Sequence, residues 1–387
     1  MKCVCLVDVA GEQMRILVVG LRGLPGVEGG VERHAEELYP RLVRLGCRVD
    51  VAVRAPFHPA GKPSHWNGLL LRRFWSPTTG GLEALVHTLI VIVYAAFSRP
   101  DIVHIHAVGP AVATPLARLA GLRVVVTHHG PDYEREKWGW FAKRVLRLGE
   151  AVGMRYANGR IAISRTIGRL IESKYRKPAD LIPNGVRPQV PRCSTRVLGE
   201  LGIKPRRYVL QVSRFVPEKR QLDLIAAFAS AALPGWHLVL VGSFDPGTDY
   251  GKRVLRSAGE ADNVILTGFR TGLDLEELYS HAGMFVLPSS HEGLPIAILE
   301  ALSYGLLTIA SDIDANAEVA LPSSQYFPLG DIEKLAERLR HGACSPMSDR
   351  DSREIRRVIG ARYDWDRIAE QTLSVYQSAG KRGLVEG

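Results

Sequence analysis

Two glutamates, Glu292 and Glu300, lie eight positions apart where a strand is expected to give way to a helix. The apolar run 284–288 predicts a buried strand, Pro295 is typical of the first turn of a helix, and 296–303 has the pattern of that helix. At the carboxyl edge of an open α/β sheet both carboxylates can face one bound molecule, and carboxylates suit the hydroxyl groups of a sugar. A helix-capping acid beside a solvated helix glutamate is the simpler alternative.

Two cations, Arg214 and Lys219, flank a short turn directly after a second expected strand, 208–212. They therefore also belong to the carboxyl end of a strand. Two cations at a diphosphate leaving group would stabilise negative charge as it develops. An ordinary surface ion pair between Lys219 and Glu218 is the alternative.

Five glycines crowd the loop after the first expected strand and precede a helix that begins near Val31. Glycine lets the backbone approach a phosphate closely, and the start of a helix offers unpaired N–H groups and the positive end of its dipole. The spacing differs from the G-x-G-x-x-G dinucleotide fingerprint, which disfavours a nicotinamide enzyme. A flexible surface loop is the alternative. The glycines are Gly20, Gly23, Gly26, Gly29 and Gly30.

An extended motif surrounds these candidates. The stretch from Leu287 to Pro295, with Glu300-Ala301-Leu302, Gly305 and Ala310-Ser311-Asp312, resembles the donor-site signature of the retaining glycosyltransferases of family four (glycosyl transferases group 1), which have the two-domain GT-B fold. The resemblance covers nearly the whole chain from Met14. Its further landmarks, in order, are Gly29-Gly30-Val31-Glu32, Thr127-His128-His129-Gly130, Pro183-Asn184-Gly185-Val186, Ser213 to Lys219, and Val241-Gly242.

The resemblance implies a role for each charged candidate. Arg214 and Lys219 are implied to hold the phosphates of a nucleotide diphosphate sugar. Glu300 is implied to bind the ribose hydroxyls of the nucleotide, and Glu292 to contact hydroxyls of the transferred sugar.

Backbone groups and a histidine complete the implied site. The N–H groups of Gly293-Leu294 and of Gly29-Gly30 are implied to reach the diphosphate from the two domains. His129 is implied to face the transferred sugar and His128 to be structural, since alternation along a strand points neighbours to opposite faces. The implied catalytic set is His129, Glu292, Arg214 and Lys219, and the implied donor-binding set is Gly29, Gly30, Arg214, Lys219, Glu292, Gly293, Leu294 and Glu300.

Two positions depart from the family pattern, and no metal is expected. Ser213 and Arg220 stand where glycine is frequent in the family, which leaves the shape of the cation loop open. His104 and His106 share one face of an expected strand, so a metal site is imaginable there. Polar residues at strand ends, and helix N-capping by the segment 312–314, explain such groups without a metal. The resemblance implies no cofactor beyond the nucleotide sugar as co-substrate.

The length of 387 residues is long for a single core and predicts two domains. Strand-like runs alternate with helix-length periodic runs, the pattern of parallel sheets covered by helices, and the periodicity fades over 188–205, the expected connection. Together with the resemblance, this predicts an α/β fold of the GT-B type, with two doubly wound Rossmann-like domains facing a central cleft. The domains are expected at 14–188 and 189–364, with 365–387 crossing back onto the first.

Individual elements follow from the apolar patterns. Helices are expected at 31–45 and 111–119 among others, and the helix 365–379 keeps apolar positions at helical spacing, so it should dock on a neighbour. The expected strands are 16–19, 49–53, 69–74, 102–106, 124–127 and 160–163 in the first half, and 208–212, 238–241, 264–266, 285–287 and 307–310 in the second.

Several features bear on location. Residues 1–13 are expected to stand apart from the fold, with Met14 as the native start, since acidic residues interrupt any signal-peptide pattern. The apolar run 85–97 has about 13 residues, short of the roughly 20 that span a bilayer, so it predicts a buried helix, with a membrane-contacting helix as the alternative. Five dispersed cysteines without a C-x-x-C pair argue against a disulfide framework or a zinc ribbon and favour the cytoplasm.

The net charge of +10 is concentrated in one segment. Residues 118–177 hold 14 Lys or Arg against 5 Asp or Glu, a surface that attracts an anionic membrane or a phosphorylated ligand. Nucleic acid is disfavoured because the sequence carries no nucleic-acid-binding motif. Within the segment, 138–147 mixes Trp and Phe with cations as interface-seeking helices do, although a solvated basic helix is an equal alternative. Peripheral contact with the inner face of the cell membrane is therefore expected.

The leading hypothesis, implied by the resemblance, is a retaining hexosyltransferase. It would move a hexose from a nucleotide diphosphate sugar onto a glycan or polyprenyl-diphosphate-linked acceptor in cell-surface polysaccharide biosynthesis. The sequence carries no evident catalytic triad, paired catalytic carboxylates or activated cysteine, which fits a reaction in which the leaving phosphate helps to deprotonate the acceptor. Two alternatives stay open: a nucleotide-sugar epimerase of the same fold, and a non-catalytic nucleotide-sugar-binding protein.

Overall fold

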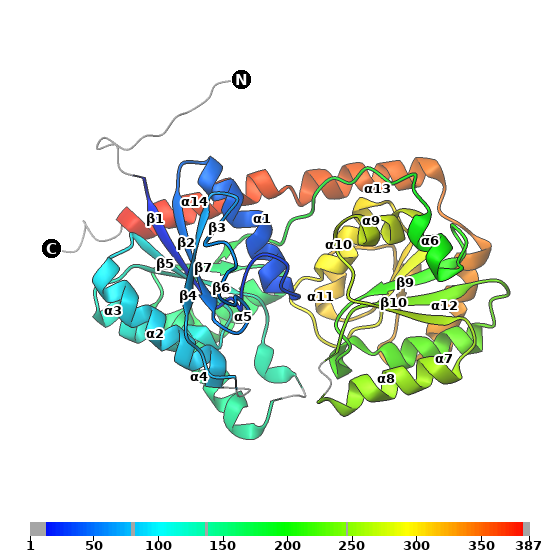
Figure 1. Ribbon diagram of the computed structural model, residues 1–387, viewed down its shortest axis with the longest axis horizontal. Helices are drawn as coiled ribbons and strands as arrows, with labels where there is room; N and C mark the ends of the chain where they lie inside the picture. The colour runs from blue at the N-terminus through cyan, green and yellow to red at the C-terminus, as the bar shows by residue number, and fades with distance from the viewer. Residues whose placement is uncertain (1–12, 79–81, 136–137, 245–246, 382–387) are drawn as a thin grey trace, which may run out of the picture. The chain divides into compact units, whose positions relative to one another are not determined.

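The structure, a computed structural model, describes residues 13–78, 82–135, 138–244 and 247–381 (Figure 1). The chain divides into two compact units. The first comprises Met1–Asn184 and Trp365–Gly387, and the second comprises Gly185–Asp364. Each unit is a Rossmann-like α/β domain built on a mostly parallel sheet, as the alternation of apolar and periodic runs predicted.

The first unit contains an eight-stranded sheet in the order β3-β4-β2-β1-β5-β6-β7-β8. Every pairing is parallel except that of β3 with β4, and Ile16 of β1 lies between Val49 of β2 and Ile102 of β5. The central strands are continuous buried runs because helices cover both faces of the sheet. The strands are β1 (Arg15–Val19), β2 (Arg48–Arg54), β3 (His65–Trp66), β4 (Leu69–Phe74), β5 (Ile102–His106), β6 (Val124–His128), β7 (Gly159–Ala162) and β8 (Asp180–Leu181).

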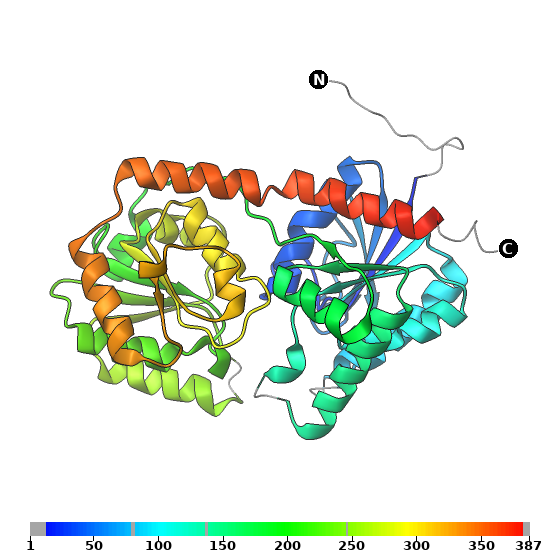
Figure 2. The ribbon, with the colours of Figure 1, turned by 180° about the vertical axis from the view of Figure 1, so that it is seen from behind.

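Two helical layers cover this sheet. On one face α1 (Gly30–Arg44) and α14 (Trp365–Lys381) pack together, and Leu38 of α1 and Ile368 of α14 share one apolar core with β1 and β2. The last helix of the chain therefore belongs to the first unit, where it lies beside α1 (Figure 2). The other face carries α2 (Leu82–Ser98), α3 (Thr114–Leu119) and α4 (Trp140–Tyr156), followed along the chain by α5 (Arg165–Tyr175).

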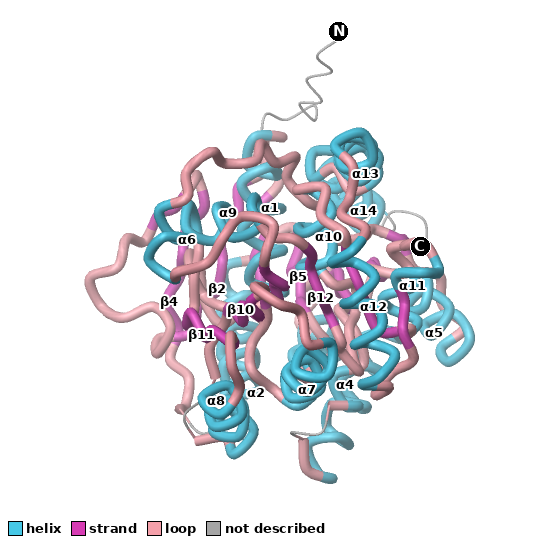
Figure 3. The backbone as a smooth tube through the Cα atoms, turned by 90° about the vertical axis from the view of Figure 1, so that its right-hand side faces the viewer, coloured by secondary structure: helices cyan, strands magenta, loops and turns pink. Residues whose placement is uncertain are grey.

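The second unit contains a six-stranded parallel sheet in the order β11-β10-β9-β12-β13-β14. Helices α7, α8 and α12 pack with the strands in one core, while α9 and α10 lie on the opposite side of the sheet (Figure 3). The strands are β9 (Tyr208–Val212), β10 (His237–Val241), β11 (Val264–Gly268), β12 (Met284–Leu287), β13 (Thr308–Ser311) and β14 (Tyr326–Phe327). The helices are α6 (Arg196–Leu201), α7 (Gln221–Ala231), α8 (Asp249–Glu260), α9 (Gly272–His281), α10 (Ile296–Ser303), α11 (Asp314–Ala317), α12 (Ile332–Cys344) and α13 (Asp349–Arg362).

Each sheet reverses its strand order at one point. In the first unit β1 lies between β2 and β5, and in the second β9 lies between β10 and β12. Loops that leave the carboxyl ends of the strands at such a switch point diverge, and open α/β sheets bind ligands there. The loop after β1 ends at Gly29, directly before Gly30, the first residue of α1, and the loops after β9 and β12 carry Arg214, Lys219 and Glu292. The topology thus places candidates of each unit at the switch point of that unit.

Three local predictions were wrong. Helix α6 interrupts the expected connection 188–205, because Glu277 accepts hydrogen bonds from the backbone N–H groups of Val197 and Leu198 and so fixes its first turn. The expected helix 111–119 begins as the 3₁₀ turn η1 (Pro110–Ala113), and Pro115 in the first turn of α3 separates the two pieces.

The third concerns Asp312. It does not cap α11, since Ile313 occupies the N-cap position, and its Oδ1 instead accepts a hydrogen bond of 3.0 Å from the backbone N–H of Leu329. At α10 the structure differs from the expectation by one position. Pro295 was expected in the first turn of the helix and instead occupies the N-cap, directly before Ile296.

Candidate active site

Lys219 and Glu292 meet at the switch point of the second unit. Lys219 ends the 3₁₀ turn η3 (Pro217–Lys219) in the loop after β9, and Glu292 lies in the loop after β12. The Nζ of Lys219 is hydrogen-bonded to Oε1 of Glu292, and the two side chains are 20% and 11% exposed. The sequence placed both residues at carboxyl ends of strands, and the structure joins them as a partly exposed ion pair.

The loop after β9 is fixed by a buried glutamine. Gln221 Nε2 donates to Ser213 Oγ at 3.0 Å and to the carbonyl of Arg214 at 2.9 Å, while Gln221 Oε1 accepts from the hydroxyl of Tyr250 at 3.1 Å. Arg220 adopts the left-handed conformation with φ 49°, which joins η3 to α7. That conformation favours glycine and explains why glycine is frequent at this position in the resembled family.

The loop after β12 is anchored from two directions. The backbone N–H of Ser290 donates to the carbonyl of Glu218 at 2.9 Å, which ties this loop to η3. Ser311 Oγ donates to the carbonyl of Ser289 at 2.5 Å, and the buried Asn316 holds Ser311 in turn. The backbone that carries Glu292 is therefore set by its neighbours and not by its own sequence alone.

Glu300 is oriented by an aromatic pair. It lies in α10, and its Oε2 accepts a hydrogen bond of 3.2 Å from the hydroxyl of the buried Tyr279. The ring of Tyr279 stacks on Tyr304 with a centroid distance of 5.3 Å. Of the neighbouring backbone candidates, Gly293 is partly exposed and Leu294 is buried. The carboxylate of Glu300 is thus held in place without being buried.

The glycine loop of the first unit ends at the start of α1. Gly29 occupies the N-cap position, which has no side-chain cap, and a Cβ on Gly29 would stand 2.0 Å from Glu32 Oε2. Arg22 Nε contacts Glu32 Oε1 at 3.1 Å, and the backbone N–H of Gly26 donates to Glu36 at 2.6 Å, so two acids of α1 fold the loop back onto the helix. An N-terminus without a side-chain cap presents N–H groups to which an anion can bind.

The adjacent histidines have different environments. His128 is fully buried, accepts from the backbone N–H of Gly130 at 3.1 Å and donates from Nε2 to Glu150 at 3.0 Å. His129 is partly exposed, and its Nε2 lies 2.8 Å from Nδ1 of His106. This geometry gives His128 a packing role and leaves His129 as the member of the pair that a ligand can reach.

The two histidines of β5 are occupied by other partners. His104 contacts the hydroxyl groups of Thr127, Tyr39 and Tyr376, and His106 contacts Tyr39 and His129. Over the ranges that the structure describes, no group of three or more His, Cys, Asp or Glu side chains could hold a metal ion. In the same ranges no helix combines the length and apolarity needed to cross a bilayer.

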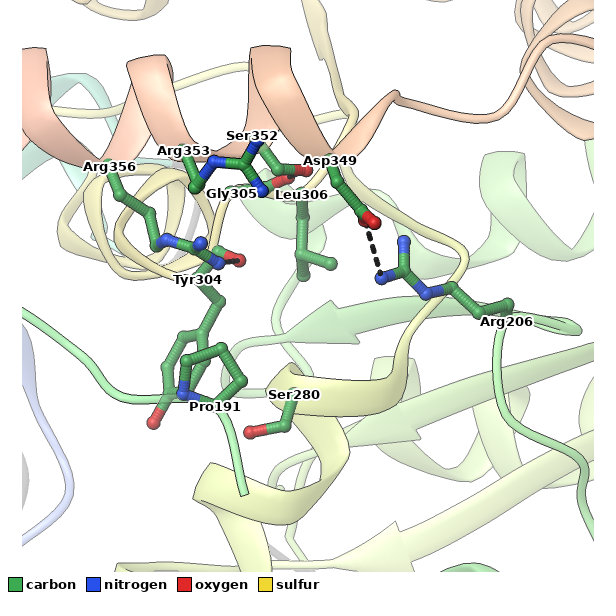
Figure 4. A pocket seen from close by; sticks show the side chains of 10 residues that line it. All are labelled: Pro191, Arg206, Ser280, Tyr304, Gly305, Leu306, Asp349, Ser352, Arg353 and Arg356. Carbon is green, nitrogen blue, oxygen red and sulfur yellow. Dashed lines mark hydrogen bonds and ion pairs between the residues drawn. The ribbon is translucent and has the colours of Figure 1, made fainter. Parts of the chain in front are cut away.

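A separate pocket of about 100 Å³ lies elsewhere in the second unit (Figure 4). It is found at the amino ends of β9 and β13, the edge opposite to the candidate loops, and contains none of the predicted site residues. Arg356 Nη1 donates to the carbonyl of Tyr304 at 3.3 Å, and Arg206 Nη2 lies 3.9 Å from Asp349. These arginines contact a helix end and an acid of their own unit.

The supporting residues gave no signal in the sequence. Each of them forms a hydrogen bond to a candidate residue or to its neighbour at a distance along the chain. Tyr279 bonds Glu300, 21 positions away, and Gln221 bonds Arg214, 7 positions away. Glu150 bonds His128, 22 positions away. A lone buried polar residue in a helix has no spacing that marks it. Only the packing of the elements reveals which candidates they hold.

Comparison with known proteins confirms the resemblance. Residues 28–190 match the family described as Glycosyltransferase Family 4, and residues 198–343 match Glycosyl transferases group 1. The GDP-mannose:cellobiosyl-diphosphopolyprenol alpha-mannosyltransferase of Xanthomonas oryzae pv. oryzae is 28% identical over 302 residues, which are 73% of this chain and 76% of the relative. The UDP-Gal:alpha-D-GlcNAc-diphosphoundecaprenol alpha-1,3-galactosyltransferase of Escherichia coli is 30% identical over 268 residues, 64% of this chain and 67% of the relative.

In two further relatives, the glycosyltransferase YqgM of Bacillus subtilis and the alpha-maltose-1-phosphate synthase of Mycobacterium tuberculosis, the aligned regions span 65% and 99% of the relative's own length. Among solved structures, Anabaena HepE in complex with UDP and glucose superposes with a TM-score of 0.77 at 20% identity. The superposition covers 95% of this chain and all of HepE, and it shows the GT-B fold.

Proposed function

We propose that this chain, which belongs to the GT-B glycosyltransferases of family 4 and is a transferase of the EC 2.4 class, moves a hexose from a nucleotide diphosphate sugar onto a lipid-linked or glycan acceptor, with retention of anomeric configuration. The observation that carries the proposal is the Lys219–Glu292 pair at the switch point of the second unit.

The pair suits an activated sugar. A lysine ammonium is a compact charge on a flexible side chain, so it can stay in contact with a phosphate that moves. The acid beside it can accept hydrogen bonds from sugar hydroxyls. Glu300, held by Tyr279, is the matching acceptor for ribose hydroxyls. Arg214, in the same loop as Lys219, adds a second cation to stabilise the departing diphosphate. We assign Gly29, Gly30, Gly293 and Leu294 as backbone donors to that diphosphate and His129 as the contact to the sugar, with no metal in the reaction.

A diphosphate-linked lipid is our favoured acceptor. The mannosyltransferase and the galactosyltransferase named above carry diphosphopolyprenol or diphosphoundecaprenol acceptors in their names, but different donors, GDP-mannose and UDP-Gal. In this chain α2, α3 and α4 lie side by side, and each exposes large apolar side chains, among them Phe97 (84%), Leu119 (86%) and Phe141 (71%). Arg144 stacks over exposed Trp140 at 4.3 Å. Apolar and cationic groups on one helix suit the anionic inner face of the cell membrane.

The experiment is a donor panel. The purified chain is incubated with UDP-, GDP- and ADP-sugars, each with and without a polyprenyl-diphosphate-linked sugar, and release of nucleoside diphosphate is measured together with the anomeric configuration of any product. We expect release that depends on the acceptor, with one donor preferred and the configuration kept. Interconversion of the nucleotide sugar without transfer would identify an epimerase, and binding without turnover would identify a sensor; either result would overturn the proposal.

A further inference from the structure

A chain of hydrogen bonds leads from His129 into the interior of the first unit. Nδ1 of His106 lies 2.8 Å from Nε2 of His129, and Nε2 of His106 is hydrogen-bonded to the hydroxyl of Tyr39 in α1. The same hydroxyl lies 2.9 Å from Nδ1 of His104. Three side chains from β5 and α1 therefore stand behind the one histidine of the predicted catalytic set.

Two further hydroxyl groups fix the inner end of this chain. His104 Nε2 lies 2.7 Å from Thr127 Oγ1, and His104 Nδ1 lies 2.6 Å from the hydroxyl of Tyr376 in α14. Tyr39, His104 and Tyr376 are fully buried, as is His106. The last helix of the chain thus contributes directly to the network that ends at His129.

The outer end of the chain is His129 itself. The residue is partly exposed, and its Nδ1 makes no hydrogen bond to any residue within the described ranges. Two histidine rings contact it, His106 of β5 at a centroid distance of 5.1 Å and His34 of α1 at 5.2 Å, and His104 and His128 lie close enough to act on its charge. Nδ1 is therefore the nitrogen that remains available to a ligand.

We propose that His106 is a positioning residue for His129, whose ring it holds with Nε2 turned inward and Nδ1 presented to a hydroxyl of the transferred sugar. The inference rests on the proposed function, because that function supplies the ligand. It adds a role for residues that lie behind the site and touch no substrate.

The contact between the two rings fixes the direction of the outer nitrogen. In a pair of imidazoles joined nitrogen to nitrogen, one hydrogen lies between them, and this bond holds Nε2 of His129 against Nδ1 of His106. Burial, and then the nearby His34, His104 and His128, hold the pKa of His129 well below its ordinary range. A neutral ring also suits the chemistry, since cleavage of a glycosidic bond develops positive charge on the sugar, which an imidazolium would oppose.

Substitution of His106 by asparagine or by glutamine can test its contact to His129 and its contact to Tyr39 one at a time. The side-chain amide of asparagine is bonded at Cγ, as Nδ1 of histidine is, whereas that of glutamine lies one atom further out, near the position of Nε2. His106→Asn should therefore keep the contact to His129 and lose the one to Tyr39, and His106→Gln should do the reverse. We expect His106→Gln to lower kcat about tenfold, the value of one hydrogen bond, and His106→Asn to recover kcat to within about threefold of the wild type.

The tautomer of His129 provides a readout that needs no turnover. With ¹⁵N-labelled histidine, and the signals of His129 assigned by their loss in His129→Asn, we expect the wild-type ring to show a single tautomer at about pH 8. In His106→Gln the two ring signals should move toward the average of both tautomers, because the contact that fixes Nε2 is lost. In His106→Asn they should keep the wild-type values.

Signals of wild-type His129 that are averaged over both tautomers, or equal loss of kcat in the two His106 variants, would overturn the inference. The wild-type spectrum decides even if a variant fails to fold. It also separates the two proposals, because a chain that transfers no sugar refutes the proposed function while the state of His129 can still be measured.

Discussion

At the scale of single residues, the proposed donor site of the second unit rests on the Lys219–Glu292 pair. The carboxylate holds the ammonium at the carboxyl edge of the sheet, where the side chains are 20% and 11% exposed. Opening a buried pair would leave an uncompensated charge in the interior, and a fully exposed pair would be only weakly held in solvent. A partly exposed pair keeps its geometry and remains within reach of a ligand.

Glu292→Gln tests the acid of this pair. The amide keeps the volume but removes the charge that fixes Lys219 and accepts from sugar hydroxyls, and hydrogen bonds to charged groups contribute about 1.5 to 3 kcal/mol. We expect kcat/KM for the nucleotide sugar to fall on the order of tenfold to a hundredfold in steady-state assays. Glu200→Gln, which removes an exposed acid paired with Arg196 in the same unit, should behave as wild type. Equal rates for Glu292→Gln and wild type would contradict the assignment.

Tyr279→Phe tests the support of Glu300. The change removes the hydroxyl that holds Oε2 at 3.2 Å and keeps the stacking of the ring on Tyr304. One hydrogen bond is worth about 1 kcal/mol, so KM for the donor should rise roughly fivefold. Little change in kcat is expected, because ribose contacts lie away from the bond that breaks. Tyr208→Phe, which removes a buried hydroxyl bonded to the carbonyl of Leu278, is the control; if it raises KM equally, Tyr279 has no specific role.

At the scale of elements, a buried carboxylate joins β6, α4 and α5. Glu150 accepts hydrogen bonds from His128 at 3.0 Å and Tyr175 at 2.6 Å, and also from Lys174. Tyr133, in the turn after His129, adds a fourth contact at 3.2 Å. This network fixes the backbone on both sides of His129.

The same carboxylate gives the fold a pH dependence. Burial alone would raise the pKa of Glu150, but the bonds from His128, Lys174 and Tyr175 outweigh it and lower the pKa from 4.5 to about 2. Because the folded-state pKa lies below the unfolded one, the stabilisation is complete above about pH 4.5 and is lost as pH falls toward 2. We expect the free energy of unfolding to drop by on the order of 3 kcal/mol across this window in chemical denaturation.

Glu150→Gln should make that slope shallower, while Glu172→Gln, an exposed acid on α5, should leave it unchanged. Equal slopes in Glu150→Gln and Glu172→Gln would contradict the assignment. Buried histidines add a slope of their own to every variant: burial lowers the pKa of His34 to about 4 and that of His104 to about 3, so stability is lost as pH falls from 6.5 toward these values, and the range of His104 overlaps that of Glu150.

The elements also show what sequence patterns can predict. The central strands carry continuous apolar runs that only a sheet covered on both faces accommodates, so β5 and β9 were located correctly from the pattern alone. The two-residue strands β3, β8 and β14 were missed because so short a run has no period.

In the candidate site, too, some features could be predicted from the sequence and others could not. Glu292 and Lys219 could be placed at carboxyl ends of strands because their position depends on where an apolar run stops. Their contact, the grip of Tyr279 on Glu300 and the chain behind His129 join residues distant in sequence, and they arise from the packing of elements. No local pattern encodes them.

At the scale of the whole molecule, the basic and apolar surface of α4 predicts membrane binding. Trp140 and Phe141 are 68% and 71% exposed at the start of this helix. We expect Trp140→Ser combined with Phe141→Ser to weaken binding to vesicles of anionic lipid about tenfold or more, since each ring would bury apolar area in the bilayer. Binding of the wild type should also weaken with salt.

Phe269→Ser combined with Leu273→Ser removes two exposed apolar side chains from the second unit and is the matched control. Sedimentation with vesicles measures both double variants. If they bind equally well, α4 is an ordinary solvated helix.

Binding of a nucleoside diphosphate, measured by titration calorimetry, tests the central claim that the carboxyl edge of the second unit holds the donor. UDP and GDP are titrated into the wild type, into Lys219→Ala, and into Arg353→Ala, which removes a cation from the pocket at the opposite edge. We predict that Lys219→Ala weakens binding about tenfold or more, since it removes a charge-assisted contact, and that Arg353→Ala binds as the wild type does. Loss of binding in Arg353→Ala with full binding in Lys219→Ala would contradict the account.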